Sequence, residues 1–307
     1  MILYMNSTFS TRAKEEMCTY PFEKTCDMAS EIYGILLFAS VFTKREIRII
    51  TANNCFASRL RKLFGNVFDI EIPLRQSSKS RYVFNLTDKS QLSRIFERYS
   101  LESEYSHSIR LNRAIIEDEC CINAFIRGAF LAGGSVSNPK TSYHLELVTP
   151  RYNLSRELMA LLMDMELEPK ITTRKSSYVI YFKYSEAIEE LLTRCGASVC
   201  AMDIMTAKIE KDVRNKLNRR VNCETANISK TVGAAVTHID AIKKLMNDNA
   251  FDALPESYRE AAKLRCENPE FSLSELAAMS GVNKATLNYR LNRIKEAAKR
   301  NTKEESQ

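Results

Sequence analysis

The amino-acid sequence predicts an α+β protein, in which a duplicated αββαββα domain with pseudo-two-fold symmetry precedes an all-α domain. Two observations predict this architecture. Helix and strand patterns recur in the same order over about 20–100 and 120–196, and strand patterns stop after about residue 200. We therefore expect the duplicated domain over 1–200, a basic helical linker over 201–224 and a helical domain over 225–307.

The duplication is carried by blocks that align in pairs. EIRIITANNCFASRLRKLF (46–64) aligns without gaps with HLELVTPRYNLSRELMALL (144–162), and both predict a strand, a turn and an amphipathic helix. Further along, RYVFNLTDKSQLSRIF (81–96) matches SYVIYFKYSEAIEELL (177–192), again a strand followed by a helix. Because the blocks keep the same order, duplication is favoured over a chance resemblance between two α/β segments.

The first helix of each repeat ends in an uncharged stretch, GILLFASV (34–41) or GAFLAGGSV (128–136). Gly34 and Gly128 would let the backbones of these two helices approach closely at the pseudo-two-fold axis. Apolar side chains at helical spacing in the second helix support this contact. The residues expected to line it are Ile122, Phe125, Ile126, Ala129 and Phe130.

This arrangement resembles the LAGLIDADG homing-endonuclease fold. In that fold each Gly-containing helix ends in an acidic residue, and the two carboxylates hold the metal ions that cleave DNA. Here the acidic positions fall on Gly133 and Ala39, so the resemblance implies a scaffold without catalytic residues. Mg²⁺ would lack its oxygen ligands, and Gly133-Gly134 is interpreted as a helix C-cap.

An active nuclease would have to use acids outside this motif. Candidates are Glu117, Asp118 and Glu119, which lie a full helix length before the expected catalytic position. That separation argues against the nuclease alternative. We expect a protein that is not an enzyme.

The nine cysteines predict neither a metal site nor a disulfide framework. Cys120 and Cys121 are adjacent, Cys195 and Cys200 are too far apart, and no Cys-x-x-Cys pair occurs. We expect reduced thiols, no metal and no cofactor. The histidines are scattered as well: His107, His144 and His238.

Beyond residue 200 the sequence predicts a series of helices. Residues 203–222 carry six Lys/Arg and three acidic residues, a pattern that suits a basic helix linking two domains. Further helices are expected over 235–246 and 255–269, the latter opened by Pro255 and ended before Pro269.

Residues 271–300 have the spacing of a helix-turn-helix. Ser272 can cap a short helix, and Glu275 completes a capping box. Gly281 stands where the tight turn needs a positive φ. A second helix would begin near Asn283 and point Leu287, Leu291 and Ile294 inward; the alternative is a generic helical hairpin.

Segment 283–300 has six Lys/Arg and one Glu, which suits a DNA-binding helix. Asn288 and Arg290 are candidates for base contacts, because Asn pairs with adenine and Arg with guanine. Lys284, Arg293 and Lys295 are expected to contact phosphates. The full set of expected DNA-binding residues is Lys284, Thr286, Asn288, Tyr289, Arg290, Arg293 and Lys295.

Basic loops fall at equivalent points of the two repeats, LRQSSKSR (74–81) and TRKSS (173–177), which would place Arg75 and Arg174 symmetrically on one side of the fold. Arg75 and Arg174 in these loops are candidates for secondary contacts with DNA or a partner. The alternative is that both loops are merely solvated.

Three segments resemble the WhiA family of bacterial regulators: RGAFLAGGSVSNP, LNRRVNCETANISKTV and LRCENPEFSLSELA. The resemblance implies a degenerate LAGLIDADG-like domain with a helix-turn-helix, and sequence-specific binding to double-stranded promoter DNA. It also implies roles in transcription, cell division, chromosome segregation and sporulation, with another regulatory protein or RNA polymerase as a further partner. The turn MSGVNKAT is shorter than is typical of the family, which leaves individual base contacts open.

The net charge of +7 permits a polyanionic partner without requiring one. The longest apolar run is far shorter than the ~20 residues of a membrane span, and no signal peptide is recognised at the start. We therefore expect a cytoplasmic, nucleoid-associated protein with no membrane partner. A protein- or ligand-sensing role for the duplicated domain, coupled to the helix-turn-helix, remains open.

Overall fold

A computed structural model describes residues 7–73, 75–76, 81–101 and 109–304, with only the backbone described for 75–76 and 301–304. His107 lies outside the described residues. The chain divides into two compact units, Met1–Lys211 and Asp212–Gln307. This division falls inside the segment expected to link the domains.

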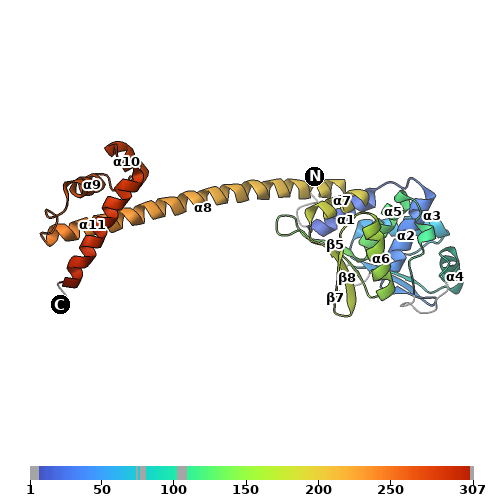
Figure 1. The fold of residues 1–307 in the computed structure, drawn as a ribbon. Coiled ribbons are helices and arrows are strands. Elements are labelled where there is room, and N and C mark those ends of the chain that lie inside the picture. Colours follow the sequence, from blue (N-terminus) through green and yellow to red (C-terminus); the bar gives the residue numbers. More distant parts are fainter. Residues whose placement is uncertain (1–6, 74, 77–80, 102–108, 305–307) are drawn as a thin grey trace. The chain divides into compact units, whose positions relative to one another are not determined.

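The first unit contains two copies of one arrangement of helices and strands (Figure 1). The αββαββα order expected from the sequence is confirmed in both repeats. An additional helix, α1 (Phe9–Thr19), precedes the first repeat, and a short helix, η2 (Arg113–Ile115), precedes the second. The first repeat comprises α2 (Thr25–Leu37), β1 (Val41–Phe42), β2 (Ile47–Thr51), α3 (Asn54–Phe68), β3 (Arg75–Gln76), β4 (Tyr82–Leu86) and α4 (Lys89–Arg98). The second comprises α5 (Glu119–Gly133), β5 (Gly134–Val136), β6 (Leu145–Thr149), α6 (Tyr152–Asp164), β7 (Lys170–Arg174), β8 (Ser177–Phe182) and α7 (Ser185–Arg194).

The two antiparallel sheets have the same topology, with strand orders β1-β2-β4-β3 and β5-β6-β8-β7. Their central pairs also share one register. Ile47 faces Leu86 in the first sheet, and Leu145 faces Phe182 in the second. Buried residues alternate with more exposed ones along β2 and β6, so each sheet buries one face against the helices.

Helices α2 and α5 pack through their glycines, as the sequence predicts. A Cβ atom at Gly34 would overlap the carbonyl oxygen of Phe125, and one at Gly128 would overlap the carbonyl oxygen of Glu31. The two contacts are equivalent under the pseudo-two-fold axis. Only glycine permits this backbone approach, because any other residue adds a Cβ where the partner carbonyl lies.

The second unit is helical. Its core contains Ile242, Leu276, Leu287, Leu291 and Ile294, each at most 1% exposed. Among the described helices, none is both long and apolar enough to cross a membrane. The helices that complete this unit are α9 (Glu256–Glu267), α10 (Leu273–Ser280) and α11 (Lys284–Glu304).

The helix α8 (Ser198–Asn247) corrects one expectation. The sequence suggested separate helices over 203–222 and 235–246, but a single helix of 50 residues covers both. No proline lies between the two segments, and a Cβ atom at Gly233 would meet nothing within 4 Å. Gly233 weakens a helix interior without ending it, since its effect is only about 1 kcal/mol.

Candidate nucleic-acid interface

The helix-turn-helix is built from the local signals that the sequence contains. Ser272 caps α10: its Oγ accepts from the Glu275 amide at 3.3 Å, and the Glu275 carboxylate accepts from the Ser272 amide at 2.7 Å. Gly281 ends the helix with φ of 67°. This left-handed conformation strains any residue with a Cβ. The expected capping box and positive-φ turn are both confirmed.

The inward face of α11 is also confirmed. Leu287, Leu291 and Ile294 are each 1% exposed and pack in the core with Leu276 and Ala277 of α10. The Asn283 side chain accepts from the Ala285 amide at 2.9 Å, which satisfies an amide in the first turn of α11. The first helix of the motif thus fixes the orientation of the second.

The outward face of α11 carries most of the expected contact residues. Lys284, Thr286, Asn288 and Arg293 are exposed, and Tyr289 is 53% exposed. Arg293 lies over the Tyr289 ring, 5.3 Å from its centroid, and donates from Nε to Tyr289 Oη at 3.0 Å. Its Nη1 also donates to Glu296 at 2.9 Å, so the ring and this carboxylate together hold the guanidinium on the helix surface.

Two expected contact residues are less accessible than the sequence suggested. Arg290 is half-buried, and its Nη1 lies 3.5 Å from the carbonyl oxygen of Ser257 at the start of α9. Lys295 is also half-buried, near His238. Burial lowers the pKa of His238, and the charges of Arg265 and Lys295 lower it further. Both cations lie beside neighbouring helices. A helical wheel describes α11 alone, so it does not show which of its residues the neighbouring helices partly cover.

Sequence reasoning missed one residue that positions the motif. Arg265 of α9 is 1% exposed and donates from Nη1 to the carbonyl oxygen of Phe271 at 2.7 Å. This bond secures the chain directly before the Ser272 cap. Burial lowers the pKa of the Arg265 guanidinium. Arg265 lies on the buried face of α9 with Ala261 and Ala262, but a long cationic side chain carried no local signal of this role.

The first unit has no room for an acidic side chain at Gly133, one of the two positions where the LAGLIDADG motif has its acid. A Cβ atom at Gly133 would lie 2.6 Å from Phe38 Cδ1 and 2.9 Å from the Val148 carbonyl oxygen, and Ala39, at the other motif position, is buried as well. Gly134 ends α5 in an extended conformation, with φ of −95°. The C-cap interpretation is confirmed, since the Gly134 amide donates to the Phe130 carbonyl oxygen at the end of α5, but packing and not a positive φ requires these glycines.

A buried cation lies at the same end of the helix pair. Arg151 is 3% exposed and donates from Nη1 to the carbonyl oxygen of Leu37 at 2.6 Å. Burial lowers the pKa of this guanidinium to about 10. The contact places positive charge at the C-terminus of α2, which the helix dipole favours.

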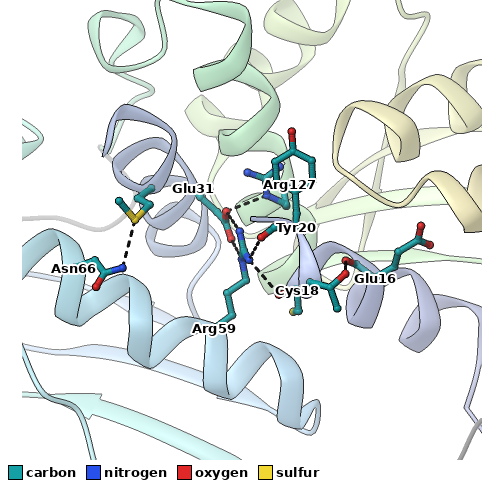
Figure 2. Close-up of polar contacts among 9 residues, drawn as sticks. Glu16, Cys18, Tyr20, Glu31, Arg59, Asn66 and Arg127 are labelled. Atoms are coloured by element: carbon teal, nitrogen blue, oxygen red, sulfur yellow. Dashed lines mark hydrogen bonds and ion pairs between the residues drawn. The ribbon is translucent and has the colours of Figure 1, made fainter. Parts of the chain in front are cut away.

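A second buried charge group joins the two repeats (Figure 2). Glu31 of α2 accepts from Arg59 Nε at 2.5 Å and from Arg127 Nε of α5 at 2.9 Å. Arg59 also donates to the carbonyl oxygens of Cys18 and Tyr20, at 3.1 and 2.6 Å. All three charged side chains are at most 4% exposed, so the group is structural and not a free anion- or cation-binding surface.

The symmetric placement expected for Arg75 and Arg174 is corrected, since the two residues lie on equivalent strands but not at equivalent positions. Arg75 pairs with Val83, whereas the matching residue of the second sheet, Val179, pairs with Thr172. Arg174 therefore lies two residues further along its strand. The Arg75 side chain is outside the described residues.

Arg174 itself takes part in an ion pair. Its Nη2 donates to Glu146 Oε1 at 2.9 Å, and His144 lies 3.3 Å from the other oxygen of the same carboxylate. Burial raises the pKa of Glu146, but the hydrogen bonds from Arg174 and His144 outweigh it and hold the pKa below its usual value. The positive charge of Arg174 is accordingly balanced on the sheet surface.

These features define a class of protein, in which a duplicated LAGLIDADG-like domain without its acids precedes a helix-turn-helix domain. Family models support both parts. The WhiA LAGLIDADG-like domain matches residues 122–214, and the WhiA C-terminal HTH domain matches residues 217–298.

Known relatives extend the match over nearly the whole chain. The chain is 35% identical over 305 residues to a probable cell division protein WhiA of Ruminiclostridium cellulolyticum, covering 95% of this chain and 97% of that protein. It is 34% identical over 307 residues to one from Clostridium botulinum, covering 95% and 98%. The crystal structure of full-length DUF199/WhiA from Thermatoga maritima matches with a TM-score of 0.59 and 25% identity, covering 96% and 99%. The chain belongs to the WhiA family.

Proposed function

We propose that this protein is a sequence-specific DNA-binding regulator of transcription with a role in cell division. The observation that carries the proposal is the capped α10, the Gly281 turn and the exposed basic face of α11. A helix presented in this way fits the major groove, where side chains reach base edges. Relatives named as probable cell division protein WhiA support the cellular role. Roles in chromosome segregation and sporulation extend it, and the site of action would be the nucleoid in the cytoplasm.

Contacts within the proposed interface divide by position along α11. Lys284, Thr286 and Asn288 lie in the first turns, which enter the groove in this class of motif. Asn288 would hydrogen-bond a base edge, and Arg293, oriented by Tyr289, would contact a phosphate. Arg290 would have to leave the Ser257 carbonyl to reach a base.

The proposal includes no catalytic step. Gly133 and Ala39 offer no side-chain oxygen, and Arg151 brings a cation to the same end of the helix pair. The acids considered as substitutes do not lie there. Glu119 begins α5, at the opposite end of the helix from Gly133, and its carboxylate pairs with Arg194 at 2.9 Å.

The duplicated unit would then serve as a binding module. Its partner would be either flanking DNA or a protein such as another regulator or RNA polymerase. The Arg174–Glu146 pair favours a protein or effector partner over a phosphate backbone, because a carboxylate beside the cation repels phosphate. Reversing Arg174 to Glu in the full-length protein distinguishes these roles. Unchanged affinity for long DNA and an unchanged salt slope would support the protein-facing role.

Sequencing the DNA fragments that are crosslinked to the protein in its own cells tests the proposed function. We expect enrichment at promoters that share one sequence motif, and loss of this enrichment in the Asn288→Ala variant. Asn66→Ala, at an exposed position of α3, is the matched control and should leave the enrichment unchanged. Uniform recovery of the chromosome would contradict the proposal.

A further inference from the structure

Four side chains with metal-ligand chemistry converge where α2 and α5 begin. Cys26 and Asp27 lie in the first turn of α2, and Cys120 and Cys121 lie in the first turn of α5. Cys26 and Cys120 stand equally far along the chain before Gly34 and Gly128, so they occupy equivalent positions of the two repeats. The close packing at the glycines brings these helix starts together, at the opposite end of the pair from Gly133.

The distances among these groups suit one small cation. The three Sγ atoms and one Asp27 carboxylate oxygen all lie within 4.8 Å of one another. Asp27 Oδ1 is 3.7 Å from Cys26 Sγ and 4.0 Å from Cys121 Sγ. A tetrahedral zinc site with Zn–S bonds of ~2.3 Å has ligand atoms about 3.8 Å apart. Small side-chain rotations would therefore complete the tetrahedron.

The electrostatics of the cluster favour a cation. The cluster holds one carboxylate and three thiols that can each become anionic. Lys24 Nζ, 3.8 Å from Cys120 Sγ, brings one positive charge, and both helix N-termini add partial positive charge. A divalent ion would neutralise the carboxylate and thiolates together.

The four ligand residues differ in how far they are exposed to solvent. Cys26 is exposed, Asp27 and Cys120 are half-buried, and Cys121 is buried in the core of the unit. An ion could enter the cluster beside the exposed Cys26, and the buried Cys121 would bind it from the side of the protein core. Four protein ligands with no open position are typical of structural rather than catalytic zinc sites.

We propose that Cys26, Asp27, Cys120 and Cys121 form a structural site for a thiophilic divalent cation, with Zn²⁺ as the ion that this Cys₃Asp donor set fits best. The ion would tie the first helices of the two repeats together at their N-terminal ends. Binding releases the thiol protons to solvent and involves no oxidation or reduction. The sequence expectation of no metal considered ligand spacing along the chain, whereas these ligands come from two separate helices.

Metal analysis of the full-length protein tests this proposal. We expect about one zinc per chain after purification under reducing conditions without chelator. After zinc is removed, added Co²⁺ should give the intense visible bands of tetrahedral cobalt and near-ultraviolet thiolate charge-transfer absorption. Cys26→Ser and Cys120→Ser should each weaken Co²⁺ binding by more than the roughly 10–100-fold that loss of an outer-shell partner costs. Cys55→Ser, at an exposed cysteine outside the cluster, should bind as the parent does.

The Asp27→Asn variant tests whether weaker Co²⁺ binding merely reflects misfolding, because it removes one ligand charge at a partly exposed position. It should retain the circular dichroism spectrum of the parent and weaken Co²⁺ binding. Tetrahedral cobalt bands that persist unchanged in Cys26→Ser and Cys120→Ser would overturn the proposal. A Cys26–Cys120 disulfide in peptide maps of metal-free protein, with no Co²⁺ binding after reduction, would overturn it as well. Neither result depends on DNA binding, so the two proposals fail separately.

Discussion

Arg151 donates a hydrogen bond to the carbonyl oxygen of Leu37, 2.6 Å away, across the boundary between the two repeats. The bond places a buried guanidinium at the C-terminus of α2. The LAGLIDADG resemblance implies a metal-binding carboxylate beside this point. Here a protein cation satisfies the helix end, so its stability requires no metal ion.

Restoring an acid at this end is not expected to restore cleavage. In Gly133→Asp the new Cβ collides with Phe38 and with the Val148 carbonyl oxygen, and the carboxylate faces a helix C-terminus. We expect destabilisation by about 1–3 kcal/mol, and supercoiled plasmid should stay intact with Mg²⁺ or Mn²⁺. Metal-dependent nicking that copurifies with the variant, and is absent from the parent, would show that the scaffold retains catalytic competence.

The glycine contact between α2 and α5 should be among the least tolerant points of the first unit. In Gly128→Ala the methyl group would overlap the Glu31 carbonyl oxygen, so we expect a loss of at least about 1–3 kcal/mol in the free energy of unfolding. Gly65→Ala, in α3, is the matched control because nothing lies within 4 Å of its added Cβ. It should stabilise by roughly 0.5–1 kcal/mol. Denaturant unfolding measures both, and equal effects would contradict the packing argument.

Glu31 should contribute far more to the free energy of unfolding than an exposed carboxylate does. Glu31→Gln leaves Arg59 and Arg127 buried without their counter-charge, which costs about 3–5 kcal/mol. Glu224→Gln removes the exposed pair with Arg220 and should cost less than about 0.5 kcal/mol. The comparison uses urea unfolding at neutral pH. A small effect at Glu31 would mean that water or another acid reaches the two guanidinium groups.

Residues of α11 should separate by their response to salt and sequence. Asn288→Ala should weaken binding to the operator by about 1–3 kcal/mol and binding to random DNA much less. Arg293→Ala should weaken both similarly and lower the salt slope by about one unit. Binding isotherms at several salt concentrations distinguish these cases. If both variants discriminate operator from random DNA as the parent does, α11 does not read the bases.

The Arg174–Glu146 pair predicts a dependence of stability on pH. The pKa of Glu146 is lower in the folded chain than in the unfolded one, so the pair stabilises above the unfolded value of about 4.3. This contribution is lost as the pH falls through the folded pKa. Arg174→Ala should raise the pKa of Glu146 in carboxylate titrations by NMR, whereas the exposed Arg156→Ala should not. An unchanged pKa would show that His144 alone holds the carboxylate ionised.

Features that depend on nearby residues were predictable from the sequence. The Ser272–Glu275 capping box, the Gly281 turn and the inward face of Leu287, Leu291 and Ile294 each follow from spacings of a few residues. The duplication was predictable for the same reason, because each repeat carries its own strand and helix periodicity. Periodicity also suggested the contact at Gly34 and Gly128, since both repeats place a glycine at one point of an apolar helix.

Contacts between segments that are far apart in the sequence were decided only by the tertiary structure. The collision at Gly133 involves Phe38 from the other repeat, and the partial burial of Arg290 depends on how α9 lies beside α11. The meeting of Cys26 with Cys120 depends on the close packing of α2 on α5. A spacing along one chain contains no information about these distances, because they are set by how two helices cross.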